Sequence, residues 1–212
     1  MNKRIEFHTH STLSDGELIP SELIRRAQVL DYEAITIADH VDFSNVEFVI
    51  SSLKKVIDET QDITVLLGVE ITHVPPGKIP KLVDKAKKLG AQIIVVHGET
   101  PVEPVAYGTN HAAASLEDVN VIAHPGLITR EDAELAHENG IFLELTTRCG
   151  HNVTNGHVAK VGKDLLVNTD CHSTSLITND YADIVARGAG LTASAAARAI
   201  NENPRILLST IL

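Results

Sequence analysis

The chain has 212 residues, of which 43% are hydrophobic and 22% charged, a composition typical of one globular domain and not of a disordered chain. Its 28 acidic and 18 basic residues give a net charge of −10, and it has no Trp, so general binding to nucleic acid or anionic membranes is disfavoured. With two Cys, no signal-peptide pattern and no apolar run of membrane-spanning length, the sequence predicts a cytoplasmic protein with free thiols.

Short apolar runs alternate with helical patterns along the chain. The runs predicted as strands are 5–7, 34–38, 64–70, 92–97, 120–124, 141–145 and 164–168. The segments predicted as helices are 20–30, 46–59, 79–90, 112–116, 128–140, 155–160, 180–186 and 193–201. Helix boundaries are indicated by Pro20 at a helix start, Thr129 as an N-cap, and Gly90 and Gly140 at helix ends.

The order of these elements predicts the fold class. The strand runs are continuous stretches of Val, Ile and Leu, which is typical of parallel strands covered on both faces. Seven strand–helix units follow one another with no break halfway, and this favours a closed or nearly closed α/β barrel of the TIM type over an open sheet. Because no linker or low-complexity tract interrupts the chain, we expect residues 1–212 to form a single domain.

Nine side chains able to bind metal lie at or just after the ends of predicted strands. They are His8, His10, Asp15, His40, Glu70, His97, His124, Asp170 and His172. In a parallel barrel the carboxyl ends of all strands open on one face, where active sites lie. Imidazole and carboxylate donors suit Zn, Mn or Fe(II), and a catalytic ion takes about three protein ligands. The sequence therefore predicts two or three divalent ions on one rim.

The rim also carries candidates for substrate binding. Arg148 follows the sixth predicted strand, and its guanidinium matches the geometry of a phosphate group. His151 and His157 are close enough in sequence to assist it, and Arg130 is a second phosphate candidate. Cys171 lies between two proposed ligands, but we expect it to pack in the core, because bound metal ions supply their own nucleophile.

Other polar residues near the rim are expected to have ordinary roles. His73 and His111 fall in predicted loops and His137 on a predicted surface helix, and we expect none of them to bind metal. Asp39 precedes His40 directly, and Glu99 follows the fourth strand. We expect each of these two carboxylates either to orient a ligating imidazole or to be solvated.

Together the motifs resemble the PHP (polymerase and histidinol phosphatase) family. They appear in the family's order between residues 8 and 172, and the stretch 147–157 is similar to compact stand-alone archaeal and bacterial members. The motifs are His8-Thr9-His10, Ser14-Asp15-Gly16, Ala38-Asp39-His40, Gly68-Val69-Glu70, Val96-His97-Gly98, Ala123-His124-Pro125-Gly126 and Asp170-Cys171-His172. The resemblance implies a distorted (β/α)7 barrel, which agrees with the seven units counted above.

The resemblance also implies how the ligands are shared among three ions. The implied sets are His8, His10, Glu70 and Asp170 for the first ion, Glu70, His97 and His124 for the second, and Asp15, His40 and His172 for the third. The chain departs from some histidinol phosphatases of the family, which carry His at the position of Asp15. It is also shorter than typical histidinol phosphatases, so it has little room for their long substrate loops.

The predicted function is a metal-dependent phosphoesterase acting on a small phosphomonoester, such as a histidinol-phosphate-like compound or a nucleotide. A hydroxide that bridges two ions would attack phosphorus, Arg148 would neutralise phosphate oxygens, and Asp170 or His172 would protonate the leaving alkoxide. We keep open a phosphodiesterase or exonuclease of the same family, a non-catalytic subunit like that of ribonuclease P, and an amidohydrolase-like barrel. No sequence feature predicts an oligomer interface.

Overall fold

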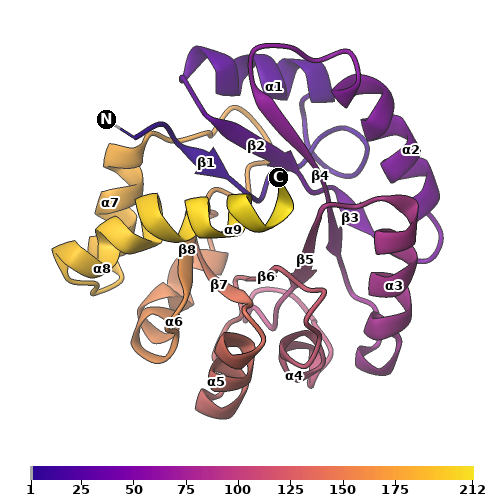
Figure 1. The fold of residues 1–212 in the computed structure, drawn as a ribbon. Helices are drawn as coiled ribbons and strands as arrows, with labels where there is room; N and C mark the ends of the chain where they lie inside the picture. Colours follow the sequence, from indigo (N-terminus) through magenta and orange to yellow (C-terminus); the bar gives the residue numbers. More distant parts are fainter. Residues whose placement is uncertain (1) are drawn as a thin grey trace.

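Figure 1 shows the computed structural model, which describes residues 2–212, as a ring of strands surrounded by helices. The hydrogen-bonded order is β1-β2-β4-β5-β6-β7-β8, all parallel, and β3 pairs with β4 beside this path. The strands are β1 (Ile5–Glu6), β2 (Ala34–Ile37), β3 (His40–Val41), β4 (Thr64–Ile71), β5 (Ile93–His97), β6 (Val121–Ala123), β7 (Phe142–Thr146) and β8 (Leu165–Asn168). This nearly closed parallel barrel of seven strands confirms the predicted (β/α)7 TIM-like architecture.

The barrel closes between β1 and β8 through side chains and a single bridge instead of a regular ladder. The Nη2 atom of Arg4 donates a 2.7 Å hydrogen bond to the carbonyl of Val167. Just beyond the strand ends, Thr9 and Cys171 form an isolated parallel bridge. Since β1 has only two residues, this seam is where the barrel departs most from a regular one.

Side chains alternate between the inside and the outside of the barrel, and the inside changes from apolar to polar along the strands. Leu66 on β4 and Ile93 on β5 belong to an inner apolar cluster. Glu70 and His97 lie four residues further along the same two strands and therefore point to the same side. The apolar cluster fills the N-terminal part of the barrel, so the buried polar side chains are left at its C-terminal end.

The helices lie outside the barrel, and α1 to α8 agree with the predicted segments to within a few residues. They are α1 (Pro20–Val29), α2 (Val46–Ile57), α3 (Ile79–Leu89), α4 (Thr109–Ala114), α5 (Arg130–Glu138), α6 (Asn155–Val161), α7 (Asn179–Gly188), α8 (Ala193–Ala197) and α9 (Asn203–Ile211). As predicted, Thr129 caps α5 by accepting from the backbone N–H of Asp132, and Gly90 ends α3 with φ of +101°. Within residues 2–212, no helix is long and apolar enough to cross a membrane.

The sequence predicts no helix after residue 201, but α8 continues through a π-helical turn, η3 (Arg198–Glu202), into α9. Pro204 lies in the first turn of α9, where its missing N–H costs nothing. Leu207 and Leu208 of α9 join the inner apolar cluster, and α9 crosses one end of the barrel in Figure 1. The helix thus closes the end opposite the polar rim.

Candidate metal centre

The nine side chains predicted to bind metal gather at the C-terminal end of the barrel. The pairing of β3 with β4 places His40 in register with Glu70, and His97 is the last residue of β5. His124 follows β6 directly, and Asp170 lies two residues beyond β8. Parallel strands therefore bring together polar residues that are far apart in the sequence.

His8, His10, Glu70 and Asp170 form the most deeply buried group. The Nε2 atoms of His8 and His10 are 2.9 Å apart and lie 3.4 and 3.5 Å from Glu70 Oε2. Asp170 Oδ1 is 3.7 Å from His8 Nε2 and 3.3 Å from His10 Nε2. Because none of these side chains is more than 3% exposed, their donor atoms face one small volume that is shielded from solvent.

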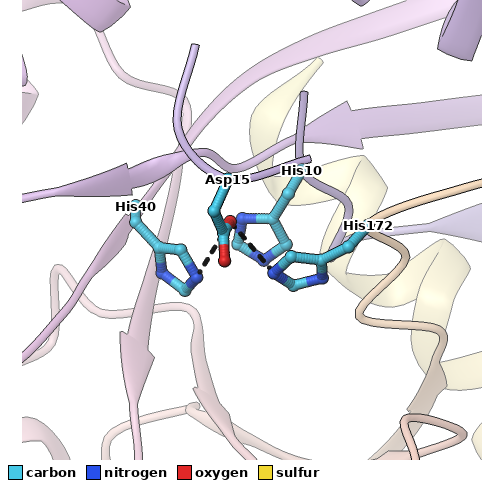
Figure 2. A group of neighbouring side chains, drawn as sticks. All are labelled: His10, Asp15, His40 and His172. Carbon is cyan, nitrogen blue, oxygen red and sulfur yellow. Dashed lines mark ion pairs between the residues drawn. The ribbon is translucent and has the colours of Figure 1, made fainter. Parts of the chain in front are cut away.

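A second group lies nearer the loop that follows β1, as Figure 2 shows. Asp15 Oδ1 lies between two imidazoles, 3.5 Å from His40 Nε2 and 3.1 Å from His172 Nε2. The ring of His10 stacks on both, with centroid distances of 4.2 Å to His40 and 4.1 Å to His172. His10 therefore links this group to the buried one.

A third group lies on the side of β5, β6 and β7. The Nε2 atom of His124 is 3.7 Å from Glu70 Oε1 and 3.5 Å from Asp170 Oδ2. The centroid of the His124 ring is 4.5 Å from that of His97 and 4.3 Å from that of His151. His151, which the sequence singles out for the substrate, is thus a buried member of an imidazole cluster.

Unpartnered polar atoms test whether this donor set fits metal ions. Within residues 2–212, the buried side-chain atoms that lack a hydrogen bond of acceptable geometry include both Glu70 oxygens and Asp170 Oδ1. Buried polar atoms are normally satisfied, so a concentration of orphaned atoms points to a missing partner. Carboxylate oxygens and imidazole nitrogens are the ligands that Zn²⁺, Mn²⁺ and Fe²⁺ share in proteins, and the residues therefore fit such ions.

The pKa values of Glu70 and Asp170 are also consistent with a site for divalent ions. Burial raises the pKa of Glu70, but the charges of His8 and His40 outweigh it and hold that pKa well below its ordinary range. Burial raises the pKa of Asp170 to about 7, against the influence of His8 and with the help of Glu70 and Glu144. The negative charges of Glu70 and Glu144 contribute to the raised pKa of Asp170, and a bound divalent cation would relieve this repulsion.

Glu144 on β7 is a residue of the site that the sequence interpretation misses. It is fully buried, and its two carboxylate oxygens accept hydrogen bonds from His8 Nδ1 at 2.8 Å and from the backbone N–H of His124 at 3.0 Å. A carboxylate on Nδ1 of an imidazole leaves Nε2 free to face an ion. The available signal is alternation, since Glu144 follows Phe142 of the inner cluster by two residues.

Asp39 has a different role from the two that were expected. Its buried carboxylate accepts hydrogen bonds from the backbone N–H and the hydroxyl of Ser11, at 2.7 and 2.6 Å, and from the hydroxyl of Ser14 at 2.6 Å. It therefore neither orients an imidazole nor faces solvent. These three bonds hold the loop that carries Asp15.

Glu99 also differs from its expected role. Its Oε1 atom accepts hydrogen bonds from the backbone N–H groups of Gly108 and Asn110, at 3.0 and 2.9 Å. It thereby closes the loop between β5 and α4. His111 and His137 are both exposed, and His111 Nδ1 lies 2.7 Å from Asp132 Oδ1.

The predicted substrate residues lie at different depths. Arg148 is half-buried at the mouth, with Nε 3.7 Å from Asp170 Oδ2. Arg130 is exposed at the start of α5, and His157 donates a 2.8 Å hydrogen bond to the carbonyl of Ile128. Cys171 is buried in the outer apolar core, in agreement with its expected packing role.

Backbone conformation marks three residues of the rim. His73, His124 and Asp170 have φ angles of +52°, +29° and +50°, while Asp31 and Asp62, in the connections before β2 and β4, have φ of +57° and +67°. Residues other than Gly rarely adopt positive φ, and such strain persists where the surrounding structure enforces it, often at functional sites. All three residues carry side chains that can bind metal.

The family of the protein follows from comparison with models of known protein families. Residues 6–119, just over half of the chain, match the model of the PHP domain. The chain belongs to the PHP domain family. The uncharacterized protein MJ1295 of Methanocaldococcus jannaschii is 50% identical over 220 residues, which cover 98% of this PHP chain and 100% of that protein.

Two further proteins resemble this chain more distantly. The DNA polymerase/3'-5' exonuclease PolX of Bacillus subtilis is 26% identical over 212 residues, which cover 88% of this chain and 37% of PolX. The histidinol phosphate phosphatase of Lactococcus lactis, solved with zinc, L-histidinol and phosphate, matches with a TM-score of 0.64. Because that pair is 16% identical, over 90% of this chain and 95% of the other, the likeness concerns the fold.

Proposed function

We propose that this PHP chain is a metal-dependent phosphoric ester hydrolase that acts on a small phosphomonoester. The observation that carries the proposal is the convergence of nine imidazole and carboxylate side chains around Glu70, with the guanidinium of Arg148 beside them. Hydrolysis of a phosphate ester needs positive charge at the phosphate oxygens and an activated water, and this donor set is suited to supply both. Membership of the PHP family supports the assignment.

The nine side chains would hold two or three divalent ions, of Zn²⁺, Mn²⁺ or Fe²⁺. The buried group around His8 and His10 would hold the first ion, and the group of Figure 2 would hold the third. Glu70 would contribute to the first and to the second, because its oxygens reach both His8 and His124. When bound, such ions lower the pKa of water from about 15.7 toward 7 and neutralise phosphate oxygens.

The protein's own groups bind and orient the substrate. Arg148 stands at the mouth, where its guanidinium would form paired hydrogen bonds with two phosphate oxygens. Either Asp170 or His172 would protonate the leaving alkoxide; Asp170 Oδ1 and His172 Nδ1 lie 3.2 Å apart. His151 lines the same mouth, and Arg130 would contact only a substrate that extends toward α5.

A phosphodiesterase or exonuclease activity is the second candidate, and the similarity to PolX over 88% of the chain favours it. The net charge of −10 weighs against a long nucleic-acid substrate, which requires a basic surface. A non-catalytic subunit of the ribonuclease P kind would have no use for a complete set of metal donors. Amidohydrolase-like enzymes usually carry a Lys at the end of a strand, and this chain has no Lys at such a position. We therefore place phosphomonoester hydrolysis first.

The test compares esters on one metal-loaded protein. Stripped protein reloaded with Zn²⁺, Mn²⁺ or Fe²⁺ is assayed on p-nitrophenyl phosphate, bis-p-nitrophenyl phosphate, histidinol phosphate and a nucleoside monophosphate. We expect monoester hydrolysis that Glu70→Gln abolishes and that His111→Ala, a change at the exposed pair with Asp132, leaves intact. Faster hydrolysis of the diester would move the second candidate to first place. A metal-loaded protein inactive on all four esters would refute the proposal.

A further inference from the structure

A buried ion pair lies at the seam between β1 and β8. Arg4 and Glu6 are 4% and 0% exposed, and Arg4 Nη2 is 2.7 Å from Glu6 Oε2. The same Nη2 atom donates to the carbonyl of Val167 on β8, also at 2.7 Å. Apolar side chains of similar volume often stabilise a fold as well as a buried ion pair does, so the stability of the barrel alone does not require this pair.

The other oxygen of Glu6 contacts the backbone beside two of the proposed metal ligands. Glu6 Oε1 accepts a 2.9 Å hydrogen bond from the N–H of Thr169, the residue that directly precedes Asp170. It also accepts a longer hydrogen bond, of 3.4 Å, from the N–H of His8. The hydroxyl of Thr169 in turn donates to the carbonyl of His8 at 3.4 Å. One buried oxygen atom therefore ties the backbone of His8 to the residue next to Asp170, across the seam.

Backbone pairing is sparse at this place in the described part of the chain. Between the segments of β1 and β8 it consists of the isolated bridge of Thr9 with Cys171, which lies beyond the two ligands. Before the ligands, the N–H of Phe7 donates to the side chain of Asn168 at 3.3 Å. Asp170 itself has φ of +50°, which takes it out of the extended conformation that a ladder requires. The carboxylate therefore takes the place of a ladder bond at the level of the two ligands.

The ligands proposed for the other ions do not depend on this carboxylate. Those of the second ion lie on or directly after β4, β5 and β6, which pair through regular ladders. His172, a proposed ligand of the third ion, follows the bridge, and its carbonyl accepts a 2.7 Å hydrogen bond from the N–H of Glu17. Loss of the Glu6 carboxylate would therefore affect the first ion selectively.

We propose that Glu6 is a positioning residue for the first ion. Its Oε1 atom fixes the backbone on both sides of the seam, so that the side chains of His8 and Asp170 converge on one ion. Arg4 holds the carboxylate in this orientation through Oε2. The inference rests on the proposed function, because these ligands belong to the proposed metal centre. Metal binding then depends on the acceptor at Oε1 and not on the ion pair as such.

Three variants separate the acceptor from the ion pair. In Glu6→Gln the donors of Arg4 attract the amide oxygen, so the amide NH₂ group faces the N–H of Thr169 and the acceptor is lost. In the acceptor-bearing double variant, Arg4→Met with Glu6→Gln, the amide can turn and its oxygen again accepts from Thr169. In the acceptor-free double variant, Arg4→Met with Glu6→Leu, apolar side chains replace the pair. Glu33→Gln, which removes a half-buried carboxylate 2.8 Å from Arg205, is the matched control.

The test measures zinc affinity in the folded proteins by competition with chromophoric chelators. Co²⁺-loaded samples are examined by visible absorption, which reports the geometry of the ligands. We expect Glu6→Gln and the acceptor-free variant to bind one zinc ion about 10–100-fold more weakly than the wild type, with altered cobalt absorption. We expect the remaining ions to bind with unchanged affinity. The acceptor-bearing variant and Glu33→Gln should bind all ions as the wild type does.

Each other outcome has a definite meaning. Wild-type zinc affinities in the acceptor-free variant overturn the role of Glu6 and leave the proposed phosphoesterase untouched. Equal weakening of both double variants also overturns it, as does equal weakening of all ions, which would mean that the whole barrel has loosened. If the acceptor-free variant does not fold, Glu6→Gln and the acceptor-bearing variant decide, and equal zinc affinities in these two overturn the role. A wild type that binds no zinc and no cobalt refutes the proposed metal centre itself.

Discussion

The carboxylate of Glu144 allows the sharpest test of how the barrel prepares its imidazoles. Glu144→Gln keeps the side-chain shape but replaces one of two accepting oxygens by an NH₂ group that can only donate. Both partners of Glu144, His8 Nδ1 and the backbone N–H of His124, are donors in this arrangement. If the NH₂ group faces His8, the ring must move its proton to Nε2, the atom that faces Glu70. If it faces His124 instead, a buried N–H loses its partner.

The magnitudes follow from these two alternatives. Replacing a residue that orients a metal-binding imidazole typically lowers metal affinity by about 10–100-fold. That range corresponds to about 1.4–2.7 kcal/mol. An unpaired buried donor lowers the free energy of unfolding of the metal-free protein by about 1–3 kcal/mol. We therefore expect Glu144→Gln to remain folded at 25 °C and to bind the tightest zinc ion about 10–100-fold more weakly.

The assay is competition for Zn²⁺ against a chromophoric chelator, with urea unfolding of the metal-free protein measured in parallel. Glu138→Gln removes the same charge from an exposed position on α5 and serves as the matched control. If a folded Glu144→Gln protein binds zinc as tightly as Glu138→Gln, the carboxylate does not prepare His8, and the reasoning about the tautomer is refuted.

Three further predictions concern the mouth, the loop after β1 and the last helix. Removing the guanidinium in Arg148→Ala should lower kcat/KM for a phosphomonoester by about 10–150-fold with unchanged zinc content, since one charge-assisted contact is lost; a kcat/KM like the wild type's would argue against a phosphate contact. Asp39→Ala leaves Ser11 and Ser14 without their acceptor. We expect urea unfolding to show a free energy of unfolding lower by about 2–4 kcal/mol, and metal analysis to show weaker binding of the ion near Asp15. A stable variant with full metal content would contradict this. Leu207→Ala should destabilise by about 2–5 kcal/mol while zinc content stays the same, because α9 lies at the opposite end of the barrel; loss of zinc from the folded variant would contradict that separation.

The sequence predicts the repeating architecture well because each strand is a short apolar run and each predicted helix carries a helical pattern of its own. The helix from Pro20 and the cap at Thr129 are local signals, and the structure confirms both. The missed helix α9 and the short β3 depend on tertiary context. Pro204 is compatible with a helix only because it falls in the first turn, and β3 exists because two residues pair with the far end of β4.

In the candidate site, too, some residues could be predicted from local sequence signals and others depend on tertiary contacts. Metal-competent residues at strand ends could be found because a parallel barrel collects all its strand ends on one face. Glu144 could not be assigned to His8, because alternation along the strand places its carboxylate inside the barrel but does not tell which imidazole it meets. Asp39 directly precedes His40, yet its partners lie in the loop after β1, a long-range contact that spacing does not encode.

The central claim is that the polar rim binds divalent ions for phosphate ester hydrolysis. The most direct test is elemental analysis of the protein purified without chelator, combined with p-nitrophenyl phosphate hydrolysis before stripping, after stripping and after reloading with Mn²⁺ or Zn²⁺. The account predicts at least two ions per chain and an activity that is lost and restored with them. Near-zero metal content after reloading, or a fully loaded protein that hydrolyses no phosphate ester, would contradict it.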